Sequence, residues 1–397
     1  MTEHADVVIV GGGVVGSSIA YHLRCDGLAG RVVVAERDPT YARASSNLAM
    51  GGIRQQFTTP ANVRMARYSV AFYLGFDERM RLGEESPAWF RQRGYLFLAT
   101  ADNAAQLERR FARQRELGVS AERWDVARVQ AALPDLVVDD VLFAIFGPSD
   151  GYANPKRVLA LFRAGADRHG AEFVTGEATA IERSGGRVSA ITLGGGGTSR
   201  RIETPVVVNA AGAWAAEVAR LVDVELPVRP VPQQLFRCRL PHRWPYRFPM
   251  VIDHDGMHWR HDDPVAPGDP DRIVVGRADP GAGESDSLDA DPARWMREVQ
   301  PILARRMPAL ATAQLEATWA GLYEMTPDHN AVIGEHPAVP GFYLANGFSG
   351  HGLMMAPATG KAVADLIRLG RSDTVDVSPF RVDRFERGEL ILDDAML

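Results

Sequence analysis

The stretch Val7-Val8-Ile9-Val10-Gly11-Gly12-Gly13-Val14-Val15-Gly16 decides the fold, because an apolar strand runs directly into a glycine turn of the pattern G-x-G-x-x-G. An apolar-periodic helical segment follows, and a second apolar strand ends at Glu36. Gly11 permits the tight turn, Gly13 lets the backbone approach a pyrophosphate, and Gly16 lets the helix pack on the strand. The stretch therefore predicts a strand–helix–strand unit that binds a dinucleotide at the N-terminus of its helix.

Glu36 narrows the choice of dinucleotide. Its carboxylate can accept hydrogen bonds from a ribose diol and would repel a 2′-phosphate, so an NADP-type ligand is disfavoured. In a chain with 38 glycines, a glycine turn shaped by packing alone is the alternative. The motif does not say which dinucleotide binds, and the rest of the chain has to decide this.

The composition is that of a soluble globular protein with two domains. The chain has 397 residues, of which 46% are hydrophobic and 24% charged, and this length exceeds one ordinary core. The net charge of -6 gives no reason to expect nucleic acid or an anionic membrane as a partner. No apolar run is long enough to cross a bilayer, and Glu3 and Asp6 argue against a signal peptide. The two cysteines, Cys25 and Cys238, lack metal-type spacing, which predicts no metal site and a reducing cytoplasm.

Two glycine-rich turns lead into predicted helices, one near each end of the chain. The second turn, Gly347–Gly352, follows a predicted strand at 341–345 and precedes a predicted helix from Ala358 to Leu369. An NAD domain needs only the first turn. A flavin uses one helix N-terminus for its pyrophosphate and a second at the N1–C2=O edge of its ring, where the dipole stabilises reduced flavin. The pair of turns therefore favours FAD.

The segments between these turns predict a mixed fold. The Ser-, Asn- and Gly-rich stretch 45–57 reads as a loop that runs close to a ligand, with a plain surface loop as the alternative. Long helices are predicted at 60–81 and 155–169. Val206–Val208 is typical of a strand buried on both faces of a parallel sheet, whereas residues 226–320 alternate in the style of antiparallel strands.

Five ordered motifs resemble the D-amino-acid oxidase superfamily of FAD-dependent oxidoreductases, closest to its sarcosine oxidase, glycine oxidase and sarcosine oxidase β-subunit branch. They are Gly11–Gly16 with Glu36, Ser45–Phe57, Asn209–Trp214, Gly321–Asp328 and Gly347–Gly352. The resemblance implies a fold of class α/β plus α+β, with a glutathione-reductase-type FAD-binding domain interleaved with an antiparallel-sheet substrate domain. We expect residues 1–85, 147–225 and 321–390 in the FAD-binding domain and residues 86–146 and 226–320 in the substrate-binding domain.

The resemblance also implies roles for individual residues. Arg54 matches an arginine that pairs with the substrate carboxylate, a role that suits its planar fork, with a structural ion pair as the alternative. His351 matches a histidine near the flavin ring, and Tyr323 matches an aromatic pocket residue. Trp259 and His258 alternate on a strand expected to roof the pocket, so only one can face it, and we expect Trp259. The expected cofactor-binding residues are Gly11, Gly13, Val14, Val15, Gly16, Glu36, Arg37, Ser45, Ser46, Met50, Gly51, Gly52, Ala178, Ala210, Gly212, Trp214, Gly347, Gly350, His351, Gly352, Leu353 and Met354.

Departures from the family pattern limit these expectations. Gly321 stands where monomeric sarcosine oxidases carry the flavin-bound cysteine, so FAD is expected to be non-covalent. Met354 replaces a lysine that helps bind carboxylate there, and Val274 falls where the oxygen-activating lysine is expected. The arginine of glycine oxidase that binds carboxylate falls at Tyr323. Oxidase activity toward sarcosine or glycine is therefore in doubt, which favours a bulkier or more apolar substrate, or an acceptor other than oxygen.

The resulting hypothesis is an FAD-dependent oxidoreductase that oxidises a primary or secondary amine of an amino acid. A hydride passes to flavin N5, and the imine formed is hydrolysed by water. The expected partners are a small-molecule amine, O2 or another acceptor, and further subunits of the same or another kind. Two alternatives stay open: a dehydrogenase subunit that delivers electrons to a partner or quinone, and a flavoprotein assembly or binding factor with little turnover.

Overall fold

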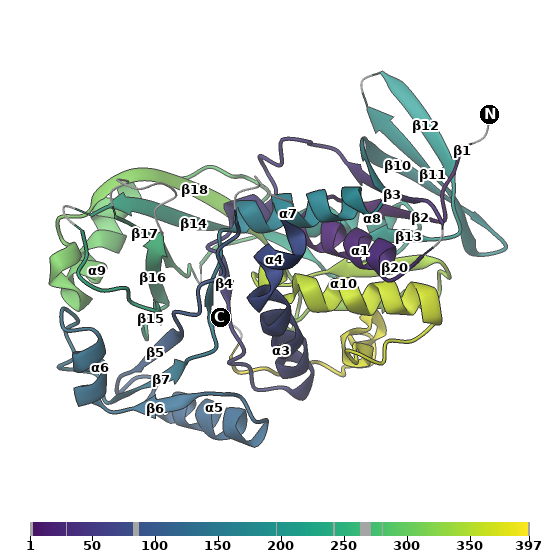
Figure 1. The fold of residues 1–397 in the computed structure, drawn as a ribbon. Helices are drawn as coiled ribbons and strands as arrows, with labels where there is room; N and C mark the ends of the chain where they lie inside the picture. Colours follow the sequence, from purple (N-terminus) through teal and green to yellow (C-terminus); the bar gives the residue numbers. More distant parts are fainter. Residues whose placement is uncertain are drawn as a thin grey trace.

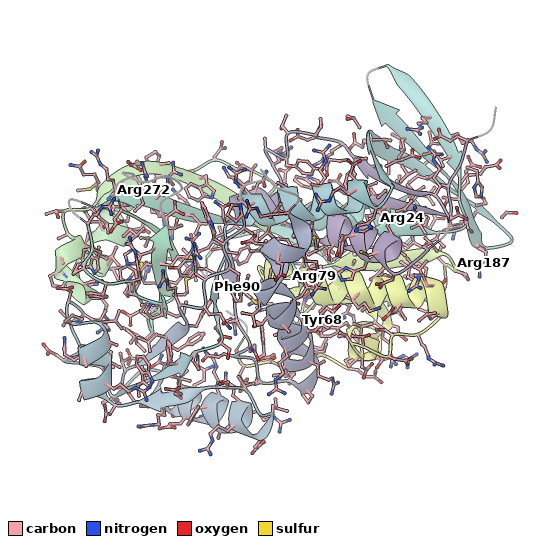
Figure 2. All side chains as sticks on the ribbon, in the orientation of Figure 1. Arg24, Tyr68, Arg79, Phe90, Arg187 and Arg272 are labelled. Atoms are coloured by element: carbon pink, nitrogen blue, oxygen red, sulfur yellow. The ribbon has the colours of Figure 1, made fainter. Side chains whose placement is uncertain are left out.

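The protein is built around two large sheets, described here from a computed structural model that covers residues 3–28, 30–81, 87–195, 197–240, 243–262, 271–279 and 281–395. Figure 1 shows them in two halves of the molecule, one with helices α1, α3, α7 and α10 and one with strands β14–β18. Figure 2 shows Arg187 and Arg272 at opposite ends.

The first sheet carries the predicted strand–helix–strand unit. It has six strands in the order β19-β20-β13-β2-β3-β9, and every neighbouring pair is parallel except β19 with β20. Because side chains alternate between the faces of a strand, Val7 and Ile9 join one hydrophobic cluster and Val8 and Val10 another. The strands are β2 (Val7–Val10), β3 (Val32–Glu36), β9 (Ala171–Thr175), β13 (Val207–Asn209), β19 (Val332–Glu335) and β20 (Phe342–Asn346).

Helices cover one face of this sheet and a smaller sheet covers the other. The helices are α1 (Val14–Cys25), α3 (Pro60–Leu74), α4 (Phe76–Met80), α7 (Pro155–Arg168) and α10 (Gly352–Leu369). On the other side lie α8 (Ala215–Arg220) and the sheet β1-β12-β11-β10, formed by β1 (Glu3–His4), β10 (Glu177–Ser184), β11 (Arg187–Gly195) and β12 (Thr198–Glu203). Strand β13 is buried on both faces, as predicted for a parallel strand.

The second large sheet has eight strands in the order β18-β14-β17-β16-β15-β5-β7-β6. It is antiparallel except for the pair β15 and β5. Its strands are β5 (Tyr95–Ala99), β6 (Glu122–Trp124), β7 (Phe143–Gly147), β14 (Arg229–Arg239), β15 (Met250–Ile252), β16 (Met257–Asp262), β17 (Arg272–Arg277) and β18 (Gln314–Met325). Helices α5 (Ala104–Glu116), α6 (Val126–Ala132) and α9 (Gln300–Arg306), with the π-helix Trp295–Val299, accompany it. The segments of the two sheets interleave along the chain, and the exact ranges of the two domains stay a prediction.

Several elements differ from the sequence-based expectation. The predicted helix at 60–81 is interrupted at Gly75, between α3 and α4. Strand β14 continues through Pro230 and Pro232. Its residues 229–234 pair only with β18, so one edge of this part makes no ladder hydrogen bonds and tolerates residues without an N–H. Strand β18 itself was not predicted.

The closing helix is also longer than predicted. It begins at Gly352 rather than Ala358 and contains Pro357. A proline removes one helical N–H, which leaves the carbonyl four residues earlier without its donor. That carbonyl belongs to Leu353, and it accepts a hydrogen bond of 2.6 Å from the hydroxyl of Tyr73. A residue on α3 therefore supplies the hydrogen bond that Pro357 removes from α10. Sequence periodicity could not reveal this contact.

Within the described ranges, no helix combines the length and apolarity needed to cross a membrane. Among the same residues, no group of three or more His, Cys, Asp or Glu side chains is placed to hold a metal ion.

Candidate cofactor and substrate site

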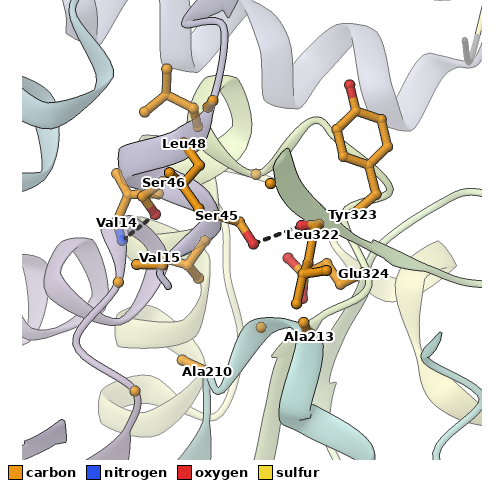
Figure 3. A pocket seen from close by; sticks show the side chains of 18 of the residues that line it. Val14, Val15, Ser45, Ser46, Leu48, Ala210, Ala213, Leu322, Tyr323 and Glu324 are labelled. Carbon is orange, nitrogen blue, oxygen red and sulfur yellow. Dashed lines mark hydrogen bonds between the residues drawn. The ribbon is translucent and has the colours of Figure 1, made fainter. Parts of the chain in front are cut away.

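A single cavity of about 620 Å³ connects the first glycine turn to the eight-stranded sheet. Its walls come from the β2–α1 turn, the end of β3, the stretch 43–54, the turn after β13, the ends of β14 and β18, and the second glycine turn. Figure 3 shows Val14 and Val15 at one side and Tyr323 and Glu324 at the other. The two regions are called the nucleotide end (residues 10–15, 35–43 and 210–221) and the reaction end (residues 50–54, 95, 250–258 and 321–354).

The nucleotide end is shaped by backbone that tolerates no side chain. Gly11 has φ +99°, and a Cβ there would overlap the carbonyl of Ala210. A Cβ at Gly16 would overlap the carbonyl of Gly11, so Gly16 holds α1 against the turn without lining the cavity. The N-terminus of α1 lines the cavity through Gly13, Val14 and Val15, and a helix N-terminus is the usual place for a pyrophosphate.

Short helix α2 (Ser45–Leu48) connects the two ends of the cavity. The Ser46 hydroxyl accepts a hydrogen bond of 3.1 Å from the N–H of Val14, and the Ser45 hydroxyl donates one of 2.6 Å to the carbonyl of Leu322 (Figure 3). The indole N–H of Trp319 adds a bond of 2.9 Å to Leu48. These bonds tie α1 of the first sheet to β18 of the second, so the Ser- and Gly-rich stretch is a structured wall rather than a surface loop.

Glu36 and Arg37 supply the polar groups of the nucleotide end. The Glu36 carboxylate accepts backbone hydrogen bonds from Gly12 at 2.8 Å and from Asp38 at 2.9 Å, which fixes it at the end of β3. The guanidinium of Arg37 lies 4.0 Å over the ring of Trp214. Its Nη2 is buried with no hydrogen-bond partner among the described residues. A buried donor without an acceptor is costly, so this nitrogen fits a bound polar ligand.

Most of the predicted cofactor-binding residues line this one cavity, and two do not. Gly16 and Gly347 lie behind its wall, where Gly347 packs against the side chain of Thr326. The lining residues are Gly11, Gly13, Val14, Val15, Glu36, Arg37, Ser45, Ser46, Met50, Gly51, Gly52, Ala178, Ala210, Gly212, Trp214, Gly350, His351, Gly352, Leu353 and Met354. Their contact with a cofactor stays a prediction.

The prediction that Trp259 faces the pocket is wrong. Its side chain is fully buried on the opposite face of the eight-stranded sheet, in a cluster with Phe236 and Trp295. The alternation along β16 turns His258 toward the cavity instead. Its Nδ1 lies 2.9 Å from the carbonyl of Gly256, and burial lowers its pKa.

Arg54 is the central group of the reaction end. Its side chain lines the cavity and is 1% exposed. Its Nη1 donates to the carbonyl of Gln56 at 2.5 Å, and its Nη2 donates to the carbonyl of Ala395 at 2.6 Å and lies 3.1 Å from Nε2 of His351. Within the described chain, no carboxylate forms an ion pair with it. The expected alternative, a structural ion pair, is therefore absent among these residues, and burial lowers the pKa of Arg54.

His351 is neutral in this arrangement. A guanidinium only donates, so Nε2 of His351 accepts from Arg54 and the proton lies on Nδ1, which is 3.3 Å from the carbonyl of Phe348. Burial, followed by the charge of Arg54, lowers the pKa of His351 to about 3. Its ring also packs edge-on against Phe57, with 5.6 Å between centroids.

Several residues of the reaction end were missed by sequence reasoning. Tyr95, on β5, lines the cavity near Gly52, and burial raises its pKa. Glu324 lines it at the end of β18, where burial raises the pKa of its carboxyl to about 7 and the N–H of Gly347 donates to it at 3.0 Å. Alternation along β5 could have suggested Tyr95, since Leu96 and Leu98 belong to the opposite hydrophobic cluster. Nothing in the local sequence marks Glu324.

The fold and this cavity together are those of a nucleotide-binding protein. The model of the family described as FAD dependent oxidoreductase matches residues 6–366, and the chain belongs to this family. It is 35% identical over 424 residues to FAD-dependent oxidoreductase domain-containing protein 1 of Bos taurus, covering 98% of this chain and 86% of that protein. It is 29% identical over 390 residues to glycine oxidase of Geobacillus kaustophilus, covering 97% and 98%.

A solved structure shows the same architecture over the whole chain. The crystal structure of L-proline dehydrogenase from P. horikoshii matches with a TM-score of 0.87 and 30% identity, covering 98% of this chain and 100% of that chain. The predicted superfamily, its interleaved fold class, the FAD cofactor and the assignment as an oxidoreductase are thus confirmed.

Proposed function

We propose that this flavoprotein oxidises the amine of an amino acid, and one observation carries the proposal. A buried guanidinium, Arg54, lines the cavity and meets no carboxylate among the described residues. A buried cation that no carboxylate contacts is expensive, and the charges of Asp393 and Asp150, which do not contact Arg54, only partly oppose the effect of burial on its pKa. A substrate carboxylate would supply the missing charge and fix the substrate's orientation.

The other residues of the reaction end shape the ligand. The rings of Tyr95 and Tyr323 and the apolar side chains of Met250 and Ile252 line the same cavity as Arg54. Bound FAD would supply a hydride acceptor at the domain interface. Because the amine has to be neutral to react, an apolar wall that lowers the substrate's pKa favours the reaction. These walls favour a substrate that is larger or more apolar than glycine.

The choice of electron acceptor depends on lysine. The chain has lysine only at positions 156 and 361, and neither lines the cavity. Lys361 pairs with Asp26 at 2.9 Å and Asp365 at 2.8 Å. Val274 is a buried core residue of β17. The absence of a lysine from the cavity wall, among the residues described, favours the second candidate, a dehydrogenase that passes electrons to an acceptor other than oxygen.

Anaerobic mixing with a panel of amino acids tests both candidates. Bleaching of the flavin absorbance by an amino acid supports amine oxidation, and no bleaching by any amine contradicts it. Admission of air then separates the acceptors. Fast reoxidation indicates an oxidase, whereas slow reoxidation that an artificial dye accelerates indicates a dehydrogenase.

Acid precipitation tests the linkage of FAD. No cysteine lines the cavity among the described residues, and Gly321 packs against Leu48 at the predicted position of the covalent link. We expect the yellow colour to remain in the supernatant. A yellow pellet would contradict non-covalent binding.

A further inference from the structure

Residues 391–395 form a segment without helix or strand that reaches the reaction end from outside the cavity. Figure 1 places this end of the chain between α3 and β5. Its buried side chain is Asp393, whose carboxylate accepts hydrogen bonds from the N–H of Thr58 at 3.0 Å, the hydroxyl of Thr58 at 2.6 Å and the hydroxyl of Thr59 at 2.9 Å. The amide of Asn62 adds a bond of 2.9 Å. These bonds lower the pKa of Asp393 against the effect of burial, so the carboxylate is a charged anchor.

This anchor sets the position of Ala395. The N–H of Ala395 donates to Asp393 at 3.0 Å, and the N–H of Asp394 donates to the hydroxyl of Thr58 at 3.1 Å. The resulting turn directs the carbonyl of Ala395 at Nη2 of Arg54, at 2.6 Å. Ala395 is 3% exposed and does not line the cavity. The segment thus contacts Arg54 from behind.

The contact leaves Arg54 without a free pair of N–H groups for a carboxylate. A carboxylate that binds a guanidinium through two N–H groups uses either Nη1 with Nη2 or Nε with Nη2. Both pairs include Nη2, and its two hydrogens already point at Ala395 and His351. Two-point binding of a substrate carboxylate therefore requires one of these two acceptors to leave.

Ala395 is the acceptor that can leave Arg54 without unfolding a helix or strand. His351 begins α10, packs against Phe57 and bonds back to Phe348, so it belongs to the folded core. The segment 391–395 has no ladder or helix bonds, and the side chains of Leu392 and Asp394 within it are exposed. Apart from the bonds made through Asp393 and Thr58, no ladder or helix bond fixes Ala395, so loss of the Asp393 anchor lets its carbonyl move at low free-energy cost.

We propose that Asp393 is a specificity-determining residue that holds the Ala395 carbonyl on Arg54 and so weakens the binding of ligands that carry a carboxylate. Ligands with a neutral group in the same place do not need two N–H groups of Arg54, so their affinity is unaffected. The selectivity of the site then depends on a residue that contacts neither cofactor nor substrate, and Asp393 acts as a positioning residue through Ala395. The inference rests on the proposed function, because it assumes that amines with a carboxylate bind beside Arg54.

Calorimetric titration of the FAD-loaded enzyme with two matched probes tests the proposal. The probes are anthranilate and its neutral amide, 2-aminobenzamide. In Asp393→Ala, the Ala395 carbonyl is no longer held on Arg54 and competes less with the carboxylate of the ligand. Because one charge-assisted hydrogen bond is at stake, we expect this variant to bind anthranilate about fivefold to tenfold more tightly. We expect its affinity for 2-aminobenzamide to stay unchanged. Asp394→Ala, which alters the exposed neighbour, is the matched control and should leave both affinities unchanged.

Two further measurements keep the test decisive. In the Arg54→Met background, Asp393→Ala should produce no gain, because the gain acts through Arg54. If Asp393→Ala does not fold, hydrogen exchange of the wild-type enzyme replaces it: anthranilate should accelerate exchange of the Asp394 and Ala395 amides, and 2-aminobenzamide should not.

The outcomes separate this inference from the proposed function. Unchanged or weaker anthranilate binding in a folded Asp393→Ala protein, or unchanged exchange in the wild type, overturns the role of Asp393 and leaves amine oxidation standing. Failure of both probes to bind any of the proteins overturns the inference, and bleaching by the amino-acid panel decides amine oxidation separately.

Discussion

The two ends of the cavity are built by different means. The nucleotide end depends mainly on backbone geometry near the first glycine turn, where Gly11 and Gly16 leave no room for a Cβ against the backbone of Ala210 and Gly11. The reaction end is side chains, and it gathers Arg54, Tyr95, Tyr323 and His351 from four distant segments, with Ala395 behind them. An error at the nucleotide end therefore damages folding and cofactor binding, whereas an error at the reaction end damages selectivity.

The largest expected effect is at the nucleotide end. In Gly16→Ala, the new Cβ meets the backbone carbonyl of Gly11 and cannot be relieved by a side-chain rotation. We expect a loss of at least about 3 kcal/mol in the free energy of unfolding, as for other core overlaps, together with a loss of bound FAD. Urea unfolding and flavin content measure both. Gly283→Ala is the control, since its Cβ would meet nothing within 4 Å, and a loss of similar size there would contradict the explanation.

Arg54→Met tests the reaction end. Removing the guanidinium takes away a charge-assisted partner for the carboxylate, which should lower kcat/KM for amino-acid substrates by about 100-fold. An amine without a carboxylate should lose far less, and the flavin content of the purified protein should be unchanged. Loss of flavin together with activity would instead make Arg54 a structural residue.

The contrast also explains what the sequence could reveal. The turn Gly11–Gly16 and the acidic residue Glu36 could be predicted from their spacing, because their roles depend on backbone segments that are close to them in the sequence. The faces of β16 are different. Alternation shows that Trp259 and His258 point in opposite directions, but both faces of this sheet are apolar, so the pattern does not say which face the cavity occupies. Arg54 itself was predicted from the family resemblance, not from spacing.

Two contacts at the reaction end leave no trace in the local sequence. The carbonyl of Ala395 bonds to Arg54 through the backbone, and any residue type offers a carbonyl. The Pro357 gap in α10 is filled by the hydroxyl of Tyr73, far away in the chain. Both depend on tertiary packing, which neither periodicity nor residue type encodes.

Glu36→Gln should have a smaller effect at the nucleotide end. The glutamine side chain keeps one acceptor oxygen but loses the negative charge and the second acceptor oxygen. The hydrogen bonds from the N–H groups of Gly12 and Asp38 become weaker, and so does any bond to a ribose. We expect FAD to bind about tenfold more weakly, which corresponds to about 1.4 kcal/mol, with kcat unchanged once FAD is saturating. Equilibrium titration of the apoprotein with FAD measures this. Glu177→Gln is the control, because this residue also lines the cavity but forms only a surface contact with Arg37.

The last prediction concerns the pH dependence of stability and rests on Asp150, which supports the reaction end from behind. Its buried carboxyl accepts from the N–H of Gln55 at 2.7 Å and from Nε2 of Gln56 at 3.1 Å, and burial raises its pKa to about 7. Oε1 of Gln56 has no partner among the described residues. A flipped Gln56 amide would present that oxygen to a protonated Asp150 or to an asparagine, so Asp150→Asn should fold.

The sign of the pH dependence follows from proton binding. The folded state keeps a proton on Asp150 up to about pH 7, whereas the unfolded chain releases it near the ordinary value of 3.8. The folded state therefore binds more protons in this window, and wild-type stability relative to Asp150→Asn should fall as the pH rises from about 4 to about 7. The slope cannot exceed about 1.4 kcal/mol per pH unit, the value for one proton. Urea unfolding of both proteins at pH 5, 6 and 7 measures it. Parallel stability curves would show that Asp150 is ionised in the fold, and that the loop carrying Arg54 is held by a charge.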